Sequence, residues 1–308
     1  MNRRYNAFSA YMKSRFGCPV YKVSVDAGFT CPNRDGTIGT SGCIYCNNDG
    51  FRPASCSPSF TVTDQIHSGI EFVQKRYRAG KYLVYFQPYT NTHAPVDTLE
   101  RLYREALANP AVIGLAIGTR PDSVDDRKIT LLQSLAEEHF ILIEYGMQSM
   151  YDKTLEFINR GHDYHTFLSA LEITINKGIL IGVHIIIGFP TETREEMLAM
   201  SDELSHLPID FLKIHHLQVI KDTPLAVLYC EDPFPVFGYD EYIDFVTEFL
   251  GRLSPRIALQ RLFAEAPDNM LIAPQWGKNR QEILRDIEKM LAQKDTWQGK
   301  NQNMYQKI

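Results

Sequence analysis

The sequence predicts an α/β fold built on parallel strands, and two observations support this. Six apolar, β-branched runs alternate with segments of helical periodicity along most of the chain. Runs such as GVHIIIGF (182–189) are apolar on both faces, as expected when helices cover one side of a sheet and a packed interior covers the other. The architecture is either a doubly wound sheet or a barrel, full or partial.

The elements follow one another in a regular order. The predicted strands are 21–29, 82–87, 112–119, 140–148, 179–189 and 211–220. The predicted helices between them are 61–79, 95–108, 122–138, 163–177 and 192–206. A capping box, Thr193-x-x-Glu196, opens the last of these helices. This alternation predicts right-handed crossovers, with ligands bound at the carboxyl ends of the strands.

The pattern changes after Lys221. A Pro-rich connection (231–240) is followed by a helix (240–252), an extended IALQRLF (257–263) and a final helix near 279–293. We therefore expect an N-terminal extension (1–20), a core barrel (21–225) and a C-terminal α/β extension packed on the barrel (226–308).

Composition narrows the class of protein. The 308 residues are 44% hydrophobic and 22% charged, typical of a globular chain, and the net charge of -5 gives no overall basic footprint for nucleic acid. The N-terminus has no signal-peptide core, and no apolar run approaches the length of a membrane helix. We expect a cytoplasmic protein with no membrane association, in which the six cysteines are not paired as structural disulfides.

Three cysteines are clustered after the first strand, in CPNRDGTIGTSGCIYC (31–46), with the spacing C-x11-C-x2-C. With Cys56 they could form a four-cysteine zinc site, although zinc ribbons usually combine two close pairs and only one is present here. Three thiolates would instead leave one iron of a [4Fe–4S] cluster without a protein ligand. The alternatives are a cluster enzyme and a zinc-stabilised barrel binding protein without redox chemistry.

The loop resembles the cluster loop of radical S-adenosylmethionine (radical SAM) enzymes, including the aromatic Tyr45 before the last cysteine. Its wide spacing is similar to that of the Elongator catalytic-subunit branch. The resemblance continues through further motifs, which closely match those of radical SAM proteins of the YhcC type. These motifs are GTRPD (118–122), GMQS (146–149), NRGH (159–162), HIIIGFPTET (184–193), KIHHLQVIKDTPLA (213–226) and QRLFAEAP (260–267).

The resemblance implies a partial (β/α)6 TIM-like barrel and a radical SAM oxidoreductase. Cys31, Cys43 and Cys46 would hold a [4Fe–4S] cluster, and S-adenosylmethionine (SAM) would chelate its open iron. Reductive cleavage of SAM would give a 5′-deoxyadenosyl radical that abstracts hydrogen from the substrate. The electron would come from a reductant such as a flavodoxin or ferredoxin.

The same resemblance implies SAM contacts at five residues: Tyr45, Gln87, Gln148, Arg160 and His184. The usual Gly-Gly-Glu after the second strand is absent, so Gln87 or the backbone near Tyr89 would receive the methionyl amine. For three of the five, a structural role is the alternative. Gln148 could cap a helix, Arg160 could pair with a surface acid, and His184 could be a buried, satisfied histidine.

The likeness to the Elongator branch suggests an RNA substrate, a tRNA uridine. The first 25 residues are compatible with this, because basic and aromatic side chains alternate there and acidic ones are absent. The competing interpretation is that Tyr5, Phe8 and Tyr11 form a helix face packed on the barrel. Arg120 likewise either steers an anionic substrate or pairs with Asp122 and Asp125.

Overall fold

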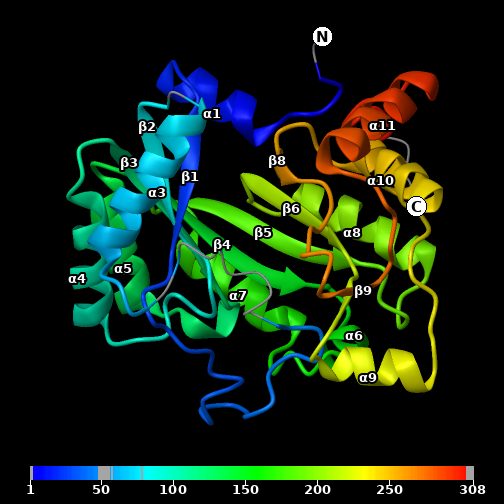
Figure 1. The fold of residues 1–308 in the computed structure, drawn as a ribbon, viewed down its shortest axis with the longest axis horizontal. Coiled ribbons are helices and arrows are strands. Elements are labelled where there is room, and N and C mark those ends of the chain that lie inside the picture. Colours follow the sequence, from blue (N-terminus) through cyan, green and yellow to red (C-terminus); the bar gives the residue numbers. More distant parts are fainter. Residues whose placement is uncertain (1–2, 48–55, 57, 78, 303–308) are drawn as a thin grey trace.

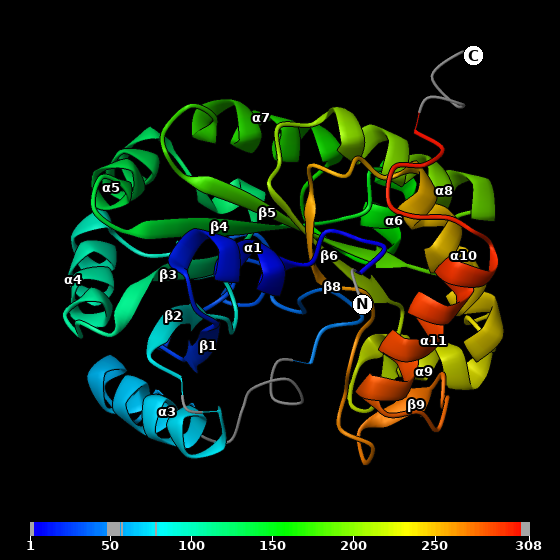
Figure 2. The same ribbon diagram turned by 90° about the horizontal axis from the view of Figure 1, so that it is seen from above.

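The central feature of the computed structural model, which describes residues 3–47, 56, 58–77 and 79–302, is a sheet of seven parallel strands (Figure 1). Seen from above, the sheet curls into a half-barrel (Figure 2). Its order is β1 (Val20–Val25), β2 (Lys81–Phe86), β3 (Val112–Thr119), β4 (Phe140–Gln148), β5 (Leu180–Ile187), β6 (Phe211–His216) and β8 (Ala258–Arg261). The prediction of a partial parallel barrel is confirmed.

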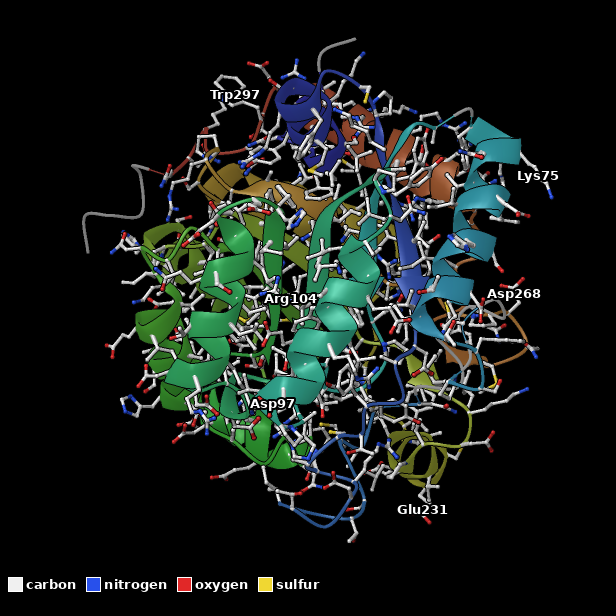
Figure 3. All side chains as sticks on the ribbon, turned by 90° about the vertical axis from the view of Figure 1, so that its left-hand side faces the viewer. Lys75, Asp97, Arg104, Glu231, Asp268 and Trp297 are labelled. Atoms are coloured by element: carbon white, nitrogen blue, oxygen red, sulfur yellow. The ribbon has the colours of Figure 1, made fainter. Side chains whose placement is uncertain are left out.

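Helices cover the convex face of the sheet. α4 shows why: Leu99, Leu102 and Tyr103 are buried on one side, whereas Asp97 and Arg104 point away from the sheet (Figure 3). The crossover helices are α3 (Val62–Tyr77), α4 (Val96–Leu107), α5 (Asp126–Ala136), α7 (Tyr164–Thr174) and α8 (Arg194–His206), with a 3-10 turn η1 (Pro121–Ser123) before α5 and a short α6 (Asp152–Phe157) before α7.

The C-terminal part adds a strand to the barrel. The segment expected to be extended at 257–263 contains β8, which continues the sheet beyond β6 as its seventh strand. The strand predicted over 211–220 is in fact two, because β6 ends at His216 and β7 (Val219–Ile220) pairs antiparallel with β9 (Leu271–Ala273). The remaining helices are α9 (Pro224–Glu231), α10 (Tyr239–Arg252) and α11 (Arg280–Gln293).

The helix α1 (Phe8–Phe16) closes the amino-terminal end of the half-barrel (Figure 2). The rings of Phe8 and Tyr11 each meet Phe211 edge-on with centroids 5.0 Å apart, and Met12 is fully buried. The packing interpretation is therefore confirmed for Phe8 and Tyr11, whereas Tyr5 precedes the helix and is buried in the main core. We call α1, together with the inward side chains Leu83, Phe140, Leu142, Phe211 and Ala258, the apolar floor.

Within the described residues, no helix is long and apolar enough to cross a bilayer.

Candidate functional site

The cysteine loop lies between β1 and α3, beside the carboxyl ends of the strands. It is fixed to the α6–α7 connection by hydrogen bonds from Asn33 Nδ2 to the Asn159 carbonyl (2.6 Å) and from the Ile44 amide to the Ile158 carbonyl (3.0 Å). Gly42 adopts φ +73°, and a Cβ there would lie only 2.7 Å from Arg34 Nε. Glycine is needed at this turn because the Arg34 side chain crosses it.

Cys31, Cys43 and Cys46 line one cavity of about 190 Å³. The Cys43 thiol is buried and lies 3.5 Å from Arg160 Nη1 and 3.8 Å from Asn33 Nδ2. Burial, with Cys43 close by, raises the pKa of the Cys46 thiol to about 11, and Arg34 acts against this rise. Three thiols facing one cavity, with guanidinium and amide donors beside them, fit the ligand set of an iron–sulfur cluster.

Cys56 is directed elsewhere. Its thiol lies 2.9 Å from the carbonyl oxygen of Ser24 on β1, a contact that the cavity-lining cysteines do not make. Across the described part of the chain, no three His, Cys, Asp or Glu side chains are grouped closely enough to hold a single metal ion. The geometry does not assemble the four-cysteine zinc site that the sequence left as an alternative.

The end of β4 brings two predicted SAM contacts together. Gln148 adopts φ +70° after a register shift that begins at Gly146, and Arg160 Nη2 donates to the Gly146 carbonyl at 2.6 Å. A Cβ on Gly146 would lie 2.6 Å from Gln148 Nε2 and 2.8 Å from Arg160 Nη2. Among the described residues, Arg160 makes no ion pair with a surface acid. It is buried between the strand end and Cys43, and its Nε has no partner within the described residues.

Arg120 is also buried at this cavity. It binds Asp122 through two hydrogen bonds, Nε to Oδ1 at 2.8 Å and Nη2 to Oδ2 at 2.6 Å. The ion-pair interpretation of Arg120 is the one observed, and Asp122 is its partner. Nη1 is buried without a hydrogen bond among the described residues.

A buried ionic network lies between the cavity and the apolar floor. We name it the Glu144 network: Glu144, Lys22, Lys213, His184 and Tyr85. The fully buried Glu144 carboxylate accepts from Lys213, from Lys22 (3.0 Å) and from His184 Nε2 (3.0 Å), and Lys213 also donates to the Tyr85 hydroxyl at 2.8 Å.

Charges within the network offset the cost of burial. Burial by itself would raise the pKa of Glu144, but Lys213 and Lys22 hold it well below its usual range. Burial, followed by the nearby Lys213 charge, lowers the pKa of His184 to about 4, so His184 is neutral at physiological pH. Glu144 is therefore an ionised carboxylate shared between two lysines.

Comparison with known proteins identifies the family. The model of the radical SAM superfamily matches residues 31–204, and the model of the radical SAM C-terminal domain matches residues 209–293. The chain belongs to the radical SAM superfamily. It is 33% identical to YtqA of Bacillus subtilis over 97% of this chain and 92% of that one. It is 31% identical to YhcC of Escherichia coli K12 over 94% and 93%.

More distant likenesses extend to the Elongator branch. The chain is 23% identical to a tRNA uridine(34) acetyltransferase of Methanocaldococcus jannaschii, over 52% of this chain and 30% of that one. The solved structure of Methanocaldococcus infernus Elp3 superposes with a TM-score of 0.71 at 17% identity, covering 91% of this chain and 64% of that one. This radical SAM chain therefore shares its fold with Elp3.

The family assignment makes this chain an enzyme, and the superfamily works with a [4Fe–4S] cluster, SAM and an external reductant. The predicted contacts Tyr45, Gln87, Gln148, Arg160 and His184 all line the cysteine cavity of this radical SAM fold. The structure therefore brings together every site residue that the sequence proposed.

Sequence reasoning missed the Glu144 network. A signal was present, because Lys22, Glu144 and Lys213 are single charges within apolar strand runs. Charged residues are rarely fully buried unless they are paired. Three such charges on parallel strands could have been read as one internal network.

Proposed function

We propose that Cys31, Cys43 and Cys46 hold the [4Fe–4S] cluster of this radical SAM enzyme, leaving one iron free for SAM. The observation that carries the proposal is that these three thiols, and not Cys56, line the same cavity. When bound and reduced, the cluster would supply the electron that splits SAM and yields the 5′-deoxyadenosyl radical, which takes hydrogen from the substrate.

The chain's own residues would orient and shield these groups. Arg160 and Asn33, donating toward Cys43, would offset the negative charge of a thiolate-bound cluster and so tune its potential. Tyr45, packed on Phe189 between the loop and the barrel, would form one wall of the SAM site. Gln87 and Gln148, at the ends of β2 and β4, and His184, within β5, would give it polar contacts.

Iron content and SAM cleavage test the proposal. Protein reconstituted anaerobically with iron and sulfide should absorb near ~400 nm and, with dithionite, convert SAM to 5′-deoxyadenosine. Cys43→Ala should lose most of the bound iron and all cleavage, whereas the matched variant Cys56→Ala should keep both. Equal iron in Cys43→Ala and wild type would overturn the assignment. So would a wild type that holds zinc instead of iron and loses it in Cys56→Ala.

We propose a tRNA nucleoside as the first substrate class to test, with a flavodoxin or ferredoxin as the reductant. The favouring observation is the likeness to tRNA uridine(34) acetyltransferase. The packed aromatic rings of α1 are not free to stack on bases, so only the basic side chains of the N-terminal segment remain available there.

Bulk tRNA binding measured against salt concentration tests this substrate class. Binding should weaken steeply as salt rises, and it should weaken further when Arg3, Arg4, Lys13 and Arg15 become Gln. Absence of tRNA binding at low salt would contradict an RNA substrate without affecting the cluster assignment.

A further inference from the structure

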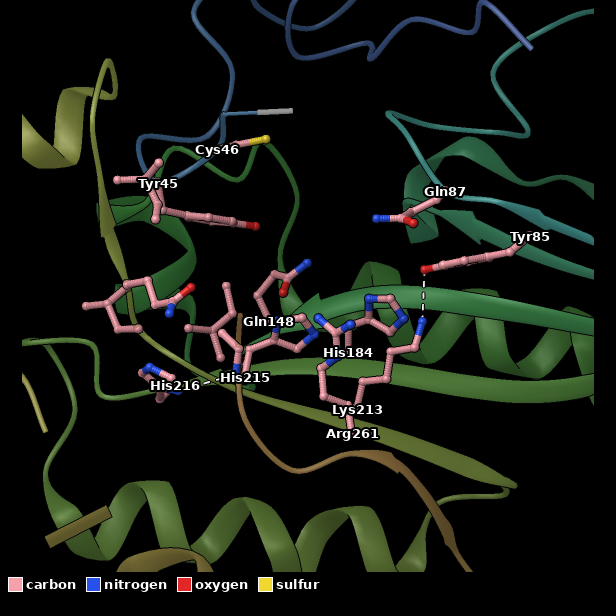
Figure 4. Close-up of a pocket in the computed structure, with 15 residues that line it drawn as sticks. Tyr45, Cys46, Tyr85, Gln87, Gln148, His184, Lys213, His215, His216 and Arg261 are labelled. Carbon is pink, nitrogen blue, oxygen red and sulfur yellow. Dashed lines mark hydrogen bonds between the residues drawn. The ribbon is translucent and has the colours of Figure 1, made fainter. Parts of the chain in front are cut away.

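A second chamber adjoins the cysteine cavity (Figure 4). Its volume is about 260 Å³, and six residues line both spaces: Tyr45, Cys46, Tyr85, Gln87, Gln148 and His184. The residues that line only this chamber come mainly from β6 and the segment that continues it through β7, and they include Lys213 and His215; β8 adds Arg261. A molecule held here would lie directly beside the proposed site of radical formation.

A β-bulge directs Arg261 into this chamber. Along β8, Ala258 belongs to the apolar floor, Leu259 packs on the outer core, and Gln260 turns inward to accept from Lys22 Nζ. Strict alternation would then turn Arg261 outward. The register between β6 and β8 shifts at this point, so that Arg261 becomes the partner of the inward-facing Lys213. Bulges of this kind re-aim side chains beside functional sites.

The Arg261 guanidinium has no counter-ion in the part of the chain that the structure describes. Within the residues that the structure describes, it makes no hydrogen bond or ion pair, although it is only partly exposed. The single carboxylate of the network, on Glu144, is already shared by Lys22 and Lys213. Two further polar atoms of the chamber, His215 Nε2 and Gln218 Oε1, are also buried without partners in the described chain.

These features are costly unless a ligand satisfies them. A buried polar group that lacks a partner loses its hydration without compensation, and an arginine fork matches a carboxylate or a phosphate with two parallel hydrogen bonds. The positive field is also felt by neighbouring groups: burial, followed by the Arg261 charge, lowers the pKa of His215.

We propose that this chamber binds the substrate of the proposed radical reaction through an anionic group, a carboxylate or a phosphate, held by Arg261. The role given to the chamber rests on the proposed function, because a radical formed in the adjoining cysteine cavity must reach a molecule bound nearby. It goes further in assigning charge to the substrate and a recognition role to a residue of the C-terminal part.

Anion binding to the reconstituted protein tests the assignment. Calorimetric titration at low ionic strength with inorganic phosphate, and separately with malonate, should show binding by the wild type, and the tighter arm would identify the preferred anion. Arg261→Gln should weaken that binding about tenfold or more, because a charge-assisted hydrogen bond is lost. Arg261→Lys should recover part of it, and the exposed Arg127→Gln should bind like the wild type.

Melting temperature and iron content would show that the Arg261 variants are folded. Equal anion affinity in wild type and Arg261→Gln would overturn the proposal. Failure of the wild type to cleave SAM would instead overturn the proposed function. The two failures are distinguishable, because anion titration requires no SAM cleavage.

Turnover with an extract of cells grown in D2O tests the substrate's charge directly. Deuterium transfer into 5′-deoxyadenosine should follow the fraction retained on an anion-exchange resin. Loss of that activity after phosphatase treatment would indicate a phosphate monoester, and its survival would favour a carboxylate or a phosphodiester. Activity confined to the unretained, neutral fraction would overturn the assignment.

Discussion

The same strands form both ends of the half-barrel interior, but one end is apolar and the other is lined by polar and charged side chains. On β4, inward positions two residues apart run from Phe140 and Leu142 in the apolar floor, through the buried Glu144, to Gly146 at the cavity. On β6, Phe211 in the floor is followed by Lys213 and then by His215 at the chamber. Each strand thus supplies packing at one end and chemistry at the other.

The contrast between the two ends explains why the Glu144 network lies where it does. The apolar floor excludes water from one side of the Glu144 network. The attraction between the charged groups of the network is therefore stronger than it would be in solvent. The same exclusion would protect a reactive radical from side reactions with water. We therefore expect substitutions in the apolar floor and in the Glu144 network to change the free energy of unfolding. The amount of bound iron should change mainly with substitutions around the cysteine cavity.

The largest change in the free energy of unfolding is expected for a substitution in the Glu144 network. Glu144→Gln leaves the buried Lys213 and the half-buried Lys22 without their shared carboxylate, which should lower the free energy of unfolding by about 3–5 kcal/mol. Urea denaturation would measure it. Adding Lys213→Met should recover part of the loss.

The control for this prediction is Glu137→Gln, which changes an exposed acid just after α5 and should stay within about 0.5 kcal/mol of the wild type. An unchanged urea midpoint in Glu144→Gln would mean that the carboxylate does not hold the two lysines in place.

Sequence reasoning was strong for the part of the site that is local in the chain. The cysteine loop lies within sixteen residues, so its spacing and the resemblance that it carries were enough to propose Cys31, Cys43 and Cys46 as ligands, and the fold places these three cysteines on one cavity. The alternation of strands and helices could be predicted as well, because a strand that is buried on both faces appears in the sequence as a continuous apolar run.

The long-range parts could not be predicted in the same way. Glu144 meets Lys22 across 122 residues, and Arg261 enters the chamber only because the register between β6 and β8 shifts. Neither fact is encoded in a local pattern, because strict alternation from the inward-facing Ala258 would turn Arg261 outward. The pairing of strands distant in sequence decides both.

The pH dependence of stability tests the role of His184 in the Glu144 network. His184 has a folded-state pKa of about 4, below its unfolded value, so the unfolded chain binds the extra proton between about pH 6.5 and 4. Its contribution, about 3 kcal/mol, is present above pH 6.5 and is lost as the pH falls toward 4. His184→Gln should flatten the measured slope in that window.

The matched variant for this measurement is His67→Gln, on the exposed side of α3, which should leave the slope as in the wild type. Identical slopes for His184→Gln and wild type would show that the burial of His184 does not carry the pH dependence.

A milder change tests the apolar floor. Phe211→Leu keeps an apolar side chain but removes two edge-on ring contacts, with Phe8 and Tyr11, and should cost about 2 kcal/mol. Urea denaturation would report the loss, and iron content after reconstitution should equal that of the wild type. Phe72→Leu, on the exposed face of α3, is the control. Loss of iron in Phe211→Leu would contradict the separation of the two ends.

The smallest expected effect concerns how α1 is held over the floor. Gly17 ends the helix in the left-handed region, with φ +73°, and a Cβ there would meet nothing within 4 Å. Gly17→Ala should therefore cost about 1 kcal/mol through backbone strain alone, without any clash. Gly80→Ala is the matched control, because its Cβ would also enter open space but its φ lies outside that region. It should be neutral or slightly stabilising, since alanine reduces the freedom of the unfolded chain. Equal midpoints for the two variants would mean that the left-handed turn after α1 contributes nothing to closing the barrel.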